Sequence, residues 1–119
     1  MMRRFGNLAN SFRCAGRGVW LAGQARNLRI MSGVSFVVVV VAATYGVSAT
    51  SWALLLICAC VVLTAEILNT AIESLADYVQ REYDEDIRTI KDLAAGAVVL
   101  AAGLAGVVGV IVLWPYVVN

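Results

Sequence analysis

Three long apolar stretches constrain the fold of this chain more than any other feature. They cover about residues 30–47, 52–79 and 93–114. A helix that crosses a bilayer needs about 20 largely apolar residues, so each stretch is a candidate span. Hydrophobic residues make up 61% of the 119 residues, and charged residues only 14%, a balance too apolar for an ordinary soluble domain of this length. The sequence therefore predicts an all-α membrane protein with a single membrane-embedded domain over residues 1–119.

The segment before the first apolar stretch is basic and amphipathic. The first 30 positions contain no acid. Their charged residues are all arginines: Arg3, Arg4, Arg13, Arg17, Arg26 and Arg29. Apolar residues recur there at the three- to four-residue spacing of one helix face: Leu8, Phe12, Ala15, Val19 and Ala22. We expect an amphipathic helix over about residues 5–27 that lies on an anionic membrane surface, rather than a cleaved signal peptide.

The distribution of charge predicts the orientation in the membrane. The amino-terminal segment is rich in arginine, and a charged loop at about 80–91 contains Arg81, Arg88 and Lys91, whereas the link at 46–51 is uncharged. By the positive-inside rule, the amino terminus and the charged loop should be cytoplasmic, and the link and carboxyl terminus outside. Trp52 and the segment Trp114-Pro115-Tyr116 are expected to be interfacial anchors, with Pro115 ending the third helix.

A polar stripe closes the second apolar stretch. At about 100° per residue, four polar residues share one helix face: Glu66, Asn69, Glu73 and Asp77. Counted from Trp52, Glu66 lies about 21 Å along the helix, just inside the cytoplasmic boundary of a core about 30 Å thick, and Glu73 lies about 10 Å further on. The spacing also fits a solvated helix face, but ionisable groups at membrane depth are costly and usually functional.

The residue inventory narrows the available chemistry. The chain has no histidine, and its three cysteines (Cys14, Cys58 and Cys60) fit neither a disulfide framework nor a thiolate metal site. It has no Walker loop and no kinase-type glycine-rich loop. Any phosphate binding must therefore rest on carboxylate-held magnesium together with Lys or Arg. Lys91-Asp92 fits this use, although ordinary charge at the flank of a span is an equal alternative.

The third apolar stretch is rich in small residues, which let helices approach closely in lipid. Ala102 and Gly106 form a small-xxx-small pair within it. Because three short spans enclose little space, we expect a homo-oligomer that packs through this surface.

Two motifs carry a resemblance to a known family. They are Glu66-Ile67-Leu68-Asn69-Thr70-Ala71-Ile72-Glu73, followed by Asp77, and Lys91-Asp92-Leu93-Ala94-Ala95-Gly96-Ala97-Val98. Weaker matches are Ser11-Phe12-Arg13, Arg26-Asn27-Leu28-Arg29 and Trp52. From about Ser11 to Pro115 the chain resembles the small integral-membrane lipid kinases that comprise bacterial diacylglycerol kinase and undecaprenol kinase. The Arg-Asn element and the Ala-Ala-Gly-Ala-Val run are closer to the undecaprenol-kinase branch.

The resemblance implies a homotrimer in the bacterial cytoplasmic (inner) membrane. Each subunit would have three transmembrane helices and an amino-terminal surface helix, with the active site between subunits at the cytoplasmic surface. The implied activity is ATP-dependent phosphorylation of a membrane lipid alcohol, either undecaprenol or diacylglycerol. Mg²⁺ would be the cofactor and ATP the co-substrate, and no nucleic-acid partner is expected.

The resemblance also implies roles for individual residues. Glu66 matches the catalytic base and Glu73 a magnesium ligand. The implied nucleotide site comprises Asn69, Glu73, Asp77, Glu82, Tyr83, Lys91 and Asp92.

One position departs from the family pattern. The family usually carries a second metal-binding Glu immediately before the Arg-Asn element, where this chain has Ala25. Gln24 is neutral and about 100° away on a helix, and Asp84 is a candidate substitute acid. The departure leaves open an alternative from another class: a catalytically impaired trimeric membrane protein that binds nucleotide or lipid without turnover.

Overall fold

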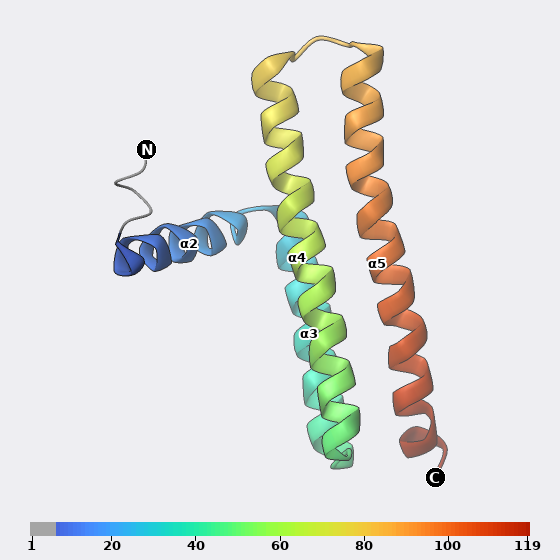
Figure 1. Ribbon diagram of the computed structural model, residues 1–119. Coiled ribbons are helices and arrows are strands. Elements are labelled where there is room, and N and C mark those ends of the chain that lie inside the picture. The colour runs from blue at the N-terminus through green and yellow to red at the C-terminus, as the bar shows by residue number, and fades with distance from the viewer. Residues whose placement is uncertain (1–6) are drawn as a thin grey trace.

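The computed structural model describes residues 7–119, and within this range the chain forms four helices and no strand (Figure 1). They are α2 (Leu8–Ala22), α3 (Arg26–Tyr45), α4 (Ala49–Val79) and α5 (Glu85–Val118). The last three are long and apolar enough to cross a membrane. The predicted all-α membrane fold with three candidate spans is therefore confirmed.

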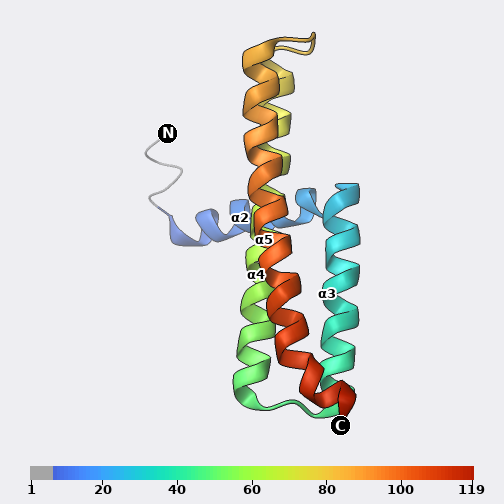
Figure 2. The ribbon, with the colours of Figure 1, turned by 90° about the vertical axis from the view of Figure 1, so that its right-hand side faces the viewer.

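The long helices α4 and α5 form an antiparallel hairpin and pack along their length (Figure 1). In Figure 2, α3 runs beside the lower part of this hairpin, and α2 crosses the direction of the other helices near the start of α3. The carboxyl terminus lies at the same end as the α3–α4 link. The α4–α5 loop lies at the opposite end, beyond the level of α2.

Helix lengths explain this arrangement. The 20 residues of α3 rise about 30 Å, which matches the thickness of a hydrocarbon core. The 31 residues of α4 rise about 46 Å, and the 34 residues of α5 about 51 Å. Because α4 runs antiparallel to α3, a rise of about 30 Å from Ala49 ends near Asn69. The remainder of the hairpin extends past the membrane on the side of α2.

The link between α3 and α4 is short because both helices have strong end signals. Gly46 ends α3 in the left-handed conformation with φ 60°, which glycine adopts without a steric penalty. Ser48 then caps α4 by accepting a hydrogen bond from the Ser51 N–H at 3.2 Å.

The main apolar cluster lies at this end of the molecule. Its buried members are Ala42, Val47, Leu55 and Val112. Beside it, the Tyr116 hydroxyl accepts a hydrogen bond from the Ser48 N–H at 3.0 Å and lies 3.5 Å from the Ser51 hydroxyl. These contacts join the end of α5 to the α3–α4 link.

The expected charged loop at about 80–91 is wrong in its extent, because α5 already begins at Glu85. Asp84 caps this helix through hydrogen bonds from the Asp86 and Ile87 N–H groups. Glu85 and Asp86 occupy the first turn, where acids interact favourably with the helix dipole. Residues 80–84 alone form the loop.

The expected surface helix over about 5–27 is also divided. Residues 5 and 6 lie outside the described range; α2 ends at Ala22, and α3 begins at Arg26. Gly23 is the C-cap of α2, and a Cβ at that position would meet the Trp20 carbonyl oxygen at 3.2 Å. Ala25 is the extended N-cap residue of α3.

Pro115 does not end the third helix as expected, because α5 continues to Val118. Proline removes one backbone donor and clashes with the preceding turn, which interrupts a helix interior most. At Pro115 the affected carbonyl is that of Ile111, so the interruption falls within the last two turns of α5.

Candidate active site

The polar stripe of α4 contains both buried and exposed residues. The buried residues of α4 recur at the spacing of one helix face: Leu55, Val62, Glu66, Asn69 and Ala76. Glu66 is 2% exposed and Asn69 6% exposed, whereas Glu73 and Asp77 are exposed. The facing part of α5 is lined by small or medium side chains such as Ala94 and Val98, which lets the two helices pack closely.

Asn69 is placed to orient Glu73. Its Nδ2 donates to Glu73 Oε1 at 3.3 Å, one turn along α4. The Asn69 Oδ1 atom is buried and has no hydrogen-bond partner within the described residues. In the same range, no donor hydrogen-bonds to the carboxylate of Glu66, which leaves this group available to a hydroxyl.

A polar pocket of about 460 Å³ lies between the ends of α4 and α5 and the loop that joins them. Its lining residues are Glu73, Gln80, Arg81, Glu82, Tyr83, Asp84, Ile87, Arg88, Lys91, Asp92 and Ala95. Five of the residues predicted for the nucleotide site are therefore brought together around one space: Glu73, Glu82, Tyr83, Lys91 and Asp92.

Three predicted site residues are engaged in two ion pairs at or beside this pocket. Lys91 Nζ donates to Asp77 Oδ1 at 2.5 Å and so joins α5 to α4. Asp92 Oδ1 accepts from Arg88 Nε at 3.3 Å within α5. Asp77 does not line the pocket, and its contact is with the lysine that does.

Arg81 and Arg88 were not among the site residues predicted from the sequence. Both line the polar pocket. Their charge was used only to predict orientation, because neither lies in one of the two motifs. The signal that could have found them is a pair of arginines within ten residues of Lys91, in a chain whose phosphate binding must rest on cations.

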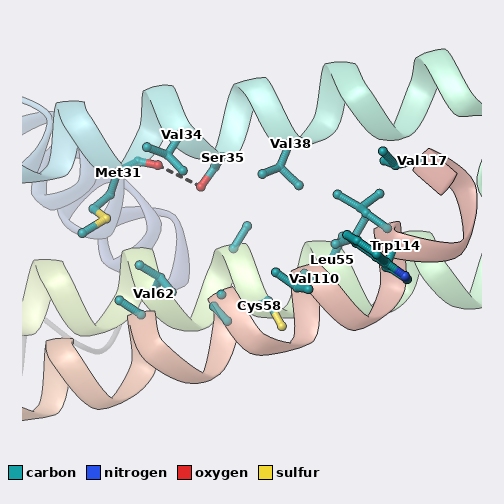
Figure 3. Close-up of a pocket in the computed structure, with 16 residues that line it drawn as sticks. Met31, Val34, Ser35, Val38, Leu55, Cys58, Val62, Val110, Trp114 and Val117 are labelled. Carbon is teal, nitrogen blue, oxygen red and sulfur yellow. Dashed lines mark hydrogen bonds between the residues drawn. The ribbon is translucent and has the colours of Figure 1, made fainter.

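A second, apolar cavity of about 520 Å³ lies between α3, α4 and α5 (Figure 3). We call it the groove; its lining residues are Met31, Val34, Ser35, Val38, Leu55, Cys58, Ala59, Val62, Ala102, Ala105, Gly106, Gly109, Val110, Leu113, Trp114 and Val117. The hydroxyl of Ser35 donates to the Met31 carbonyl at 2.9 Å, so this polar side chain is satisfied within α3. Ala102 and Gly106, which were expected to pack helices together, line the groove within one chain.

Glu66 lies between the two cavities. Val62, one turn before it on α4, lines the groove, and Glu73, two turns after it, lines the polar pocket. On α5, Ala102 lines the groove and Ala95 lines the polar pocket, with the buried Val98 between them. Glu66 itself lines neither cavity, and its position along α4 is between the apolar groove and the polar pocket on the side of the α4–α5 loop.

The residues present fit a magnesium ion that is shared with a substrate, rather than one held wholly by protein. Among residues 7–119, no group of three or more acidic, His or Cys side chains is arranged to hold a metal. Glu73 offers one carboxylate, and Asn69 Oδ1 is an unpartnered oxygen beside it. Mg²⁺ commonly takes one or two carboxylates, substrate phosphates and water. Asp84, the candidate substitute acid, uses Oδ1 to cap α5.

Comparison with known proteins decides the family. The sequence model described as prokaryotic diacylglycerol kinase matches residues 13–113 of this chain. The chain belongs to the prokaryotic diacylglycerol kinase family. The resemblance carried by the two motifs is thereby confirmed.

Individual relatives agree with this membership. The chain is 41% identical to a diacylglycerol kinase of Synechocystis sp. over 111 residues, 92% of this chain and 63% of that protein. It is 29% identical to an undecaprenol kinase of Bacillus subtilis over 106 residues, 88% of this chain and 86% of that protein. It is 36% identical to a diacylglycerol kinase of Escherichia coli K12 over 78 residues, 66% of this chain and 64% of that protein. The matches thus span less than two thirds of the Synechocystis and E. coli relatives.

Proposed function

We propose that this protein is a lipid kinase that transfers the γ-phosphate of ATP to the hydroxyl of a membrane lipid alcohol. The observation that carries the proposal is the position of Glu66, a buried carboxylate between the groove and the polar pocket. Membership of the prokaryotic diacylglycerol kinase family supports it. The non-catalytic alternative gains no support from the relatives, which are named as kinases.

In the proposed reaction, the apolar body of the lipid occupies the groove, and its hydroxyl reaches Glu66. The Glu66 carboxylate accepts the hydroxyl proton while the lipid oxygen attacks the γ-phosphorus. A new P–O bond forms to the lipid, the bond between the γ-phosphorus and the β–γ bridging oxygen breaks, and ADP leaves. General base catalysis of this kind contributes about 10²- to 10⁴-fold to a rate, and the rest comes from positioning and charge stabilisation.

The nucleotide is proposed to occupy the polar pocket. Lys91 faces the phosphates, and Asp77 positions Lys91 through their 2.5 Å contact. Tyr83 is 78% exposed and offers an aromatic face to the base, with Glu82 beside it. Glu73, oriented by Asn69, would hold magnesium together with the phosphates. When bound there, Mg²⁺ would offset the negative charge of the phosphates.

The acceptor, the assembly and the membrane are part of the same proposal. Relatives are named both diacylglycerol kinase and undecaprenol kinase, and both lipids present a primary hydroxyl on a long apolar body. We propose a homotrimer in the bacterial inner membrane with a cytoplasmic amino terminus. The basic amino-terminal segment and the many exposed apolar side chains of α3, α4 and α5 support this arrangement.

The test is phosphate transfer from labelled ATP, measured in detergent–lipid mixtures with undecaprenol and diacylglycerol in parallel. We expect magnesium-dependent transfer to at least one lipid. Absence of transfer to both, from protein shown to be folded by its helical circular dichroism, would instead favour binding without turnover.

A further inference from the structure

Three cationic side chains line the polar pocket, and they differ in how they are paired with acids. Lys91 is held by Asp77 across the two helices, with the lysine side chain 34% exposed. Arg88 pairs with Asp92 within α5, where both side chains are about two-thirds exposed, at 64% and 67%. Arg81 lies in the α4–α5 loop and has no ion-pair partner within the described residues. Lys91 is therefore tied into the fold, whereas Arg81 and Arg88 keep most of their donors free.

The backbone does not provide an alternative phosphate cradle at this end of α5. A helix amino terminus binds anions through its free N–H groups. Here Asp84 Oδ1 already accepts from the Asp86 N–H at 2.9 Å and the Ile87 N–H at 3.2 Å. The capping carboxylate also places a negative charge where a phosphate would bind. Besides the magnesium proposed at Glu73, phosphates in this pocket must therefore rely on side-chain cations rather than on the backbone of α5.

The balance of charge makes these cations necessary. Carboxylates outnumber cations among the lining residues, with Glu73, Glu82, Asp84 and Asp92 against Arg81, Arg88 and Lys91. A triphosphate that entered such a pocket would be repelled unless arginine side chains turned toward it. An exposed ion pair such as Arg88–Asp92 contributes little to stability, so phosphate can replace the carboxylate at small cost.

We propose that Arg81 and Arg88 bind the phosphates of the nucleotide, as residues additional to the two motifs. This inference rests on the proposed function and deepens it. Guanidinium groups bind phosphate oxygens through two parallel N–H donors, a geometry that an ammonium group does not reproduce. Arg81 approaches from the loop and Arg88 from α5, so the two arginines enclose the phosphates together with Lys91.

The experiment compares Arg81→Gln, Arg88→Gln and the double variant with the native chain. Arg17→Gln on α2 is the matched control, because it removes the same charge from an exposed residue that does not line the pocket. Two readouts are needed: KM for ATP and for lipid in the transfer assay, and calorimetric titration with Mg²⁺–ADP. We expect each single variant to raise the KM for ATP and the Kd for ADP about tenfold, which is about 1.4 kcal/mol. The double variant should raise the KM for ATP and the Kd for ADP further, and the KM for lipid should stay unchanged. Arg88→Lys should recover only part of the loss.

The possible failures are distinguishable. If the native chain transfers phosphate and binds Mg²⁺–ADP, but both arginine variants match Arg17→Gln, this inference is overturned and the proposed function stands. A rise in the lipid KM alone would assign the arginines to a lipid headgroup and would also overturn the inference. If the native chain neither transfers phosphate nor binds Mg²⁺–ADP, the proposed function fails together with the inference.

Discussion

Glu66 and Glu73 lie two turns apart on one face of α4, and they differ in their surroundings more than in their chemistry. Glu66 is buried, one turn beyond Val62, which lines the groove. Glu73 is exposed at the polar pocket and bonded to Asn69. In the proposed reaction a lipid hydroxyl meets the first carboxylate and the metal-bound phosphates the second, so substitutions of the two residues should have different effects.

We expect Glu66→Gln to lower kcat by about 10²- to 10⁴-fold with little change in the KM for ATP, because an amide cannot accept the proton. Glu73→Gln should raise the KM for ATP and the magnesium concentration required for half-maximal rate. Glu85→Gln is the control, since this acid lies on the same hairpin but outside the polar pocket. Steady-state kinetics with varied ATP and magnesium provide the measurement, and identical defects in both variants would contradict the proposed division of roles.

Ala25 offers a second test at the scale of single residues. It is the N-cap of α3, where no side chain caps the helix, and the family pattern places a metal-binding Glu there. We expect Ala25→Glu to increase the transfer rate at saturating magnesium by adding an oxygen ligand of the type magnesium prefers. The gain should shrink when magnesium is scarce, because the added carboxylate contributes only as a ligand of bound metal. Titration of magnesium against rate checks this, with Ala25→Gln as the uncharged control.

At the scale of elements, the end of α5 is fastened to the α3–α4 link by the hydroxyl of Tyr116. The Tyr116 hydroxyl accepts a hydrogen bond from the Ser48 N–H and lies beside the Ser51 hydroxyl, next to the apolar cluster around Ala42 and Val112. At the site end, the Lys91–Asp77 pair is the one side-chain hydrogen bond between α4 and α5 among residues 7–119. The hairpin is therefore held by hydrogen bonds of the Tyr116 hydroxyl at one end and by an ion pair at the other.

Tyr116→Phe should lower the free energy of unfolding by about 1 kcal/mol, because it leaves the Ser48 N–H without its partner. Tyr45→Phe is the matched control at the same end of the molecule, since no hydrogen bond of its hydroxyl is present in the described residues. Unfolding by denaturant in detergent micelles, followed by circular dichroism, measures the difference. Equal stability of the two variants would show that the Tyr116 hydroxyl contributes nothing to this junction.

At the scale of the whole molecule, three helices enclose a groove that no pair of them would form. α3 contributes Met31 and Val38, α4 contributes Val62, and α5 contributes its small residues (Figure 3). Gly106 lies in this wall, and a Cβ there would meet nothing within 4 Å. A larger side chain at this position would therefore project into open space without distorting the fold of the chain.

We expect Gly106→Leu to raise the KM for lipid severalfold, because leucine would take up space in a cavity of about 520 Å³. Gly103→Leu is the control, since Gly103 is exposed on α5, does not line the groove and also has open space around a Cβ. Lipid dependence of the rate and mass in mild detergent should be measured together. A loss of oligomer mass in Gly106→Leu, with the lipid KM unchanged, would assign the groove to a helix of a neighbouring subunit instead.

The sequence by itself determined the class of fold and the polar face of α4. Apolar length and helix periodicity are local properties, so the three candidate spans and the polar stripe from Glu66 to Asp77 could be predicted from residue order alone. The limits of the elements were less predictable. Asp84 caps α5 through hydrogen bonds from the Asp86 and Ile87 N–H groups, a contact made at a single position, and α2 ends at Ala22 with Gly23 as its C-cap.

Only the tertiary structure decided which side chains meet. Lys91 reaches Asp77 because α5 returns antiparallel to α4, and Arg81 and Arg88 join the polar pocket because a five-residue loop turns between the helices. Spacing along one helix could not reveal these contacts, since the residues lie on different elements. The groove arises for the same reason: α3, α4 and α5 are all apolar, and only their packing leaves an open space beside Glu66.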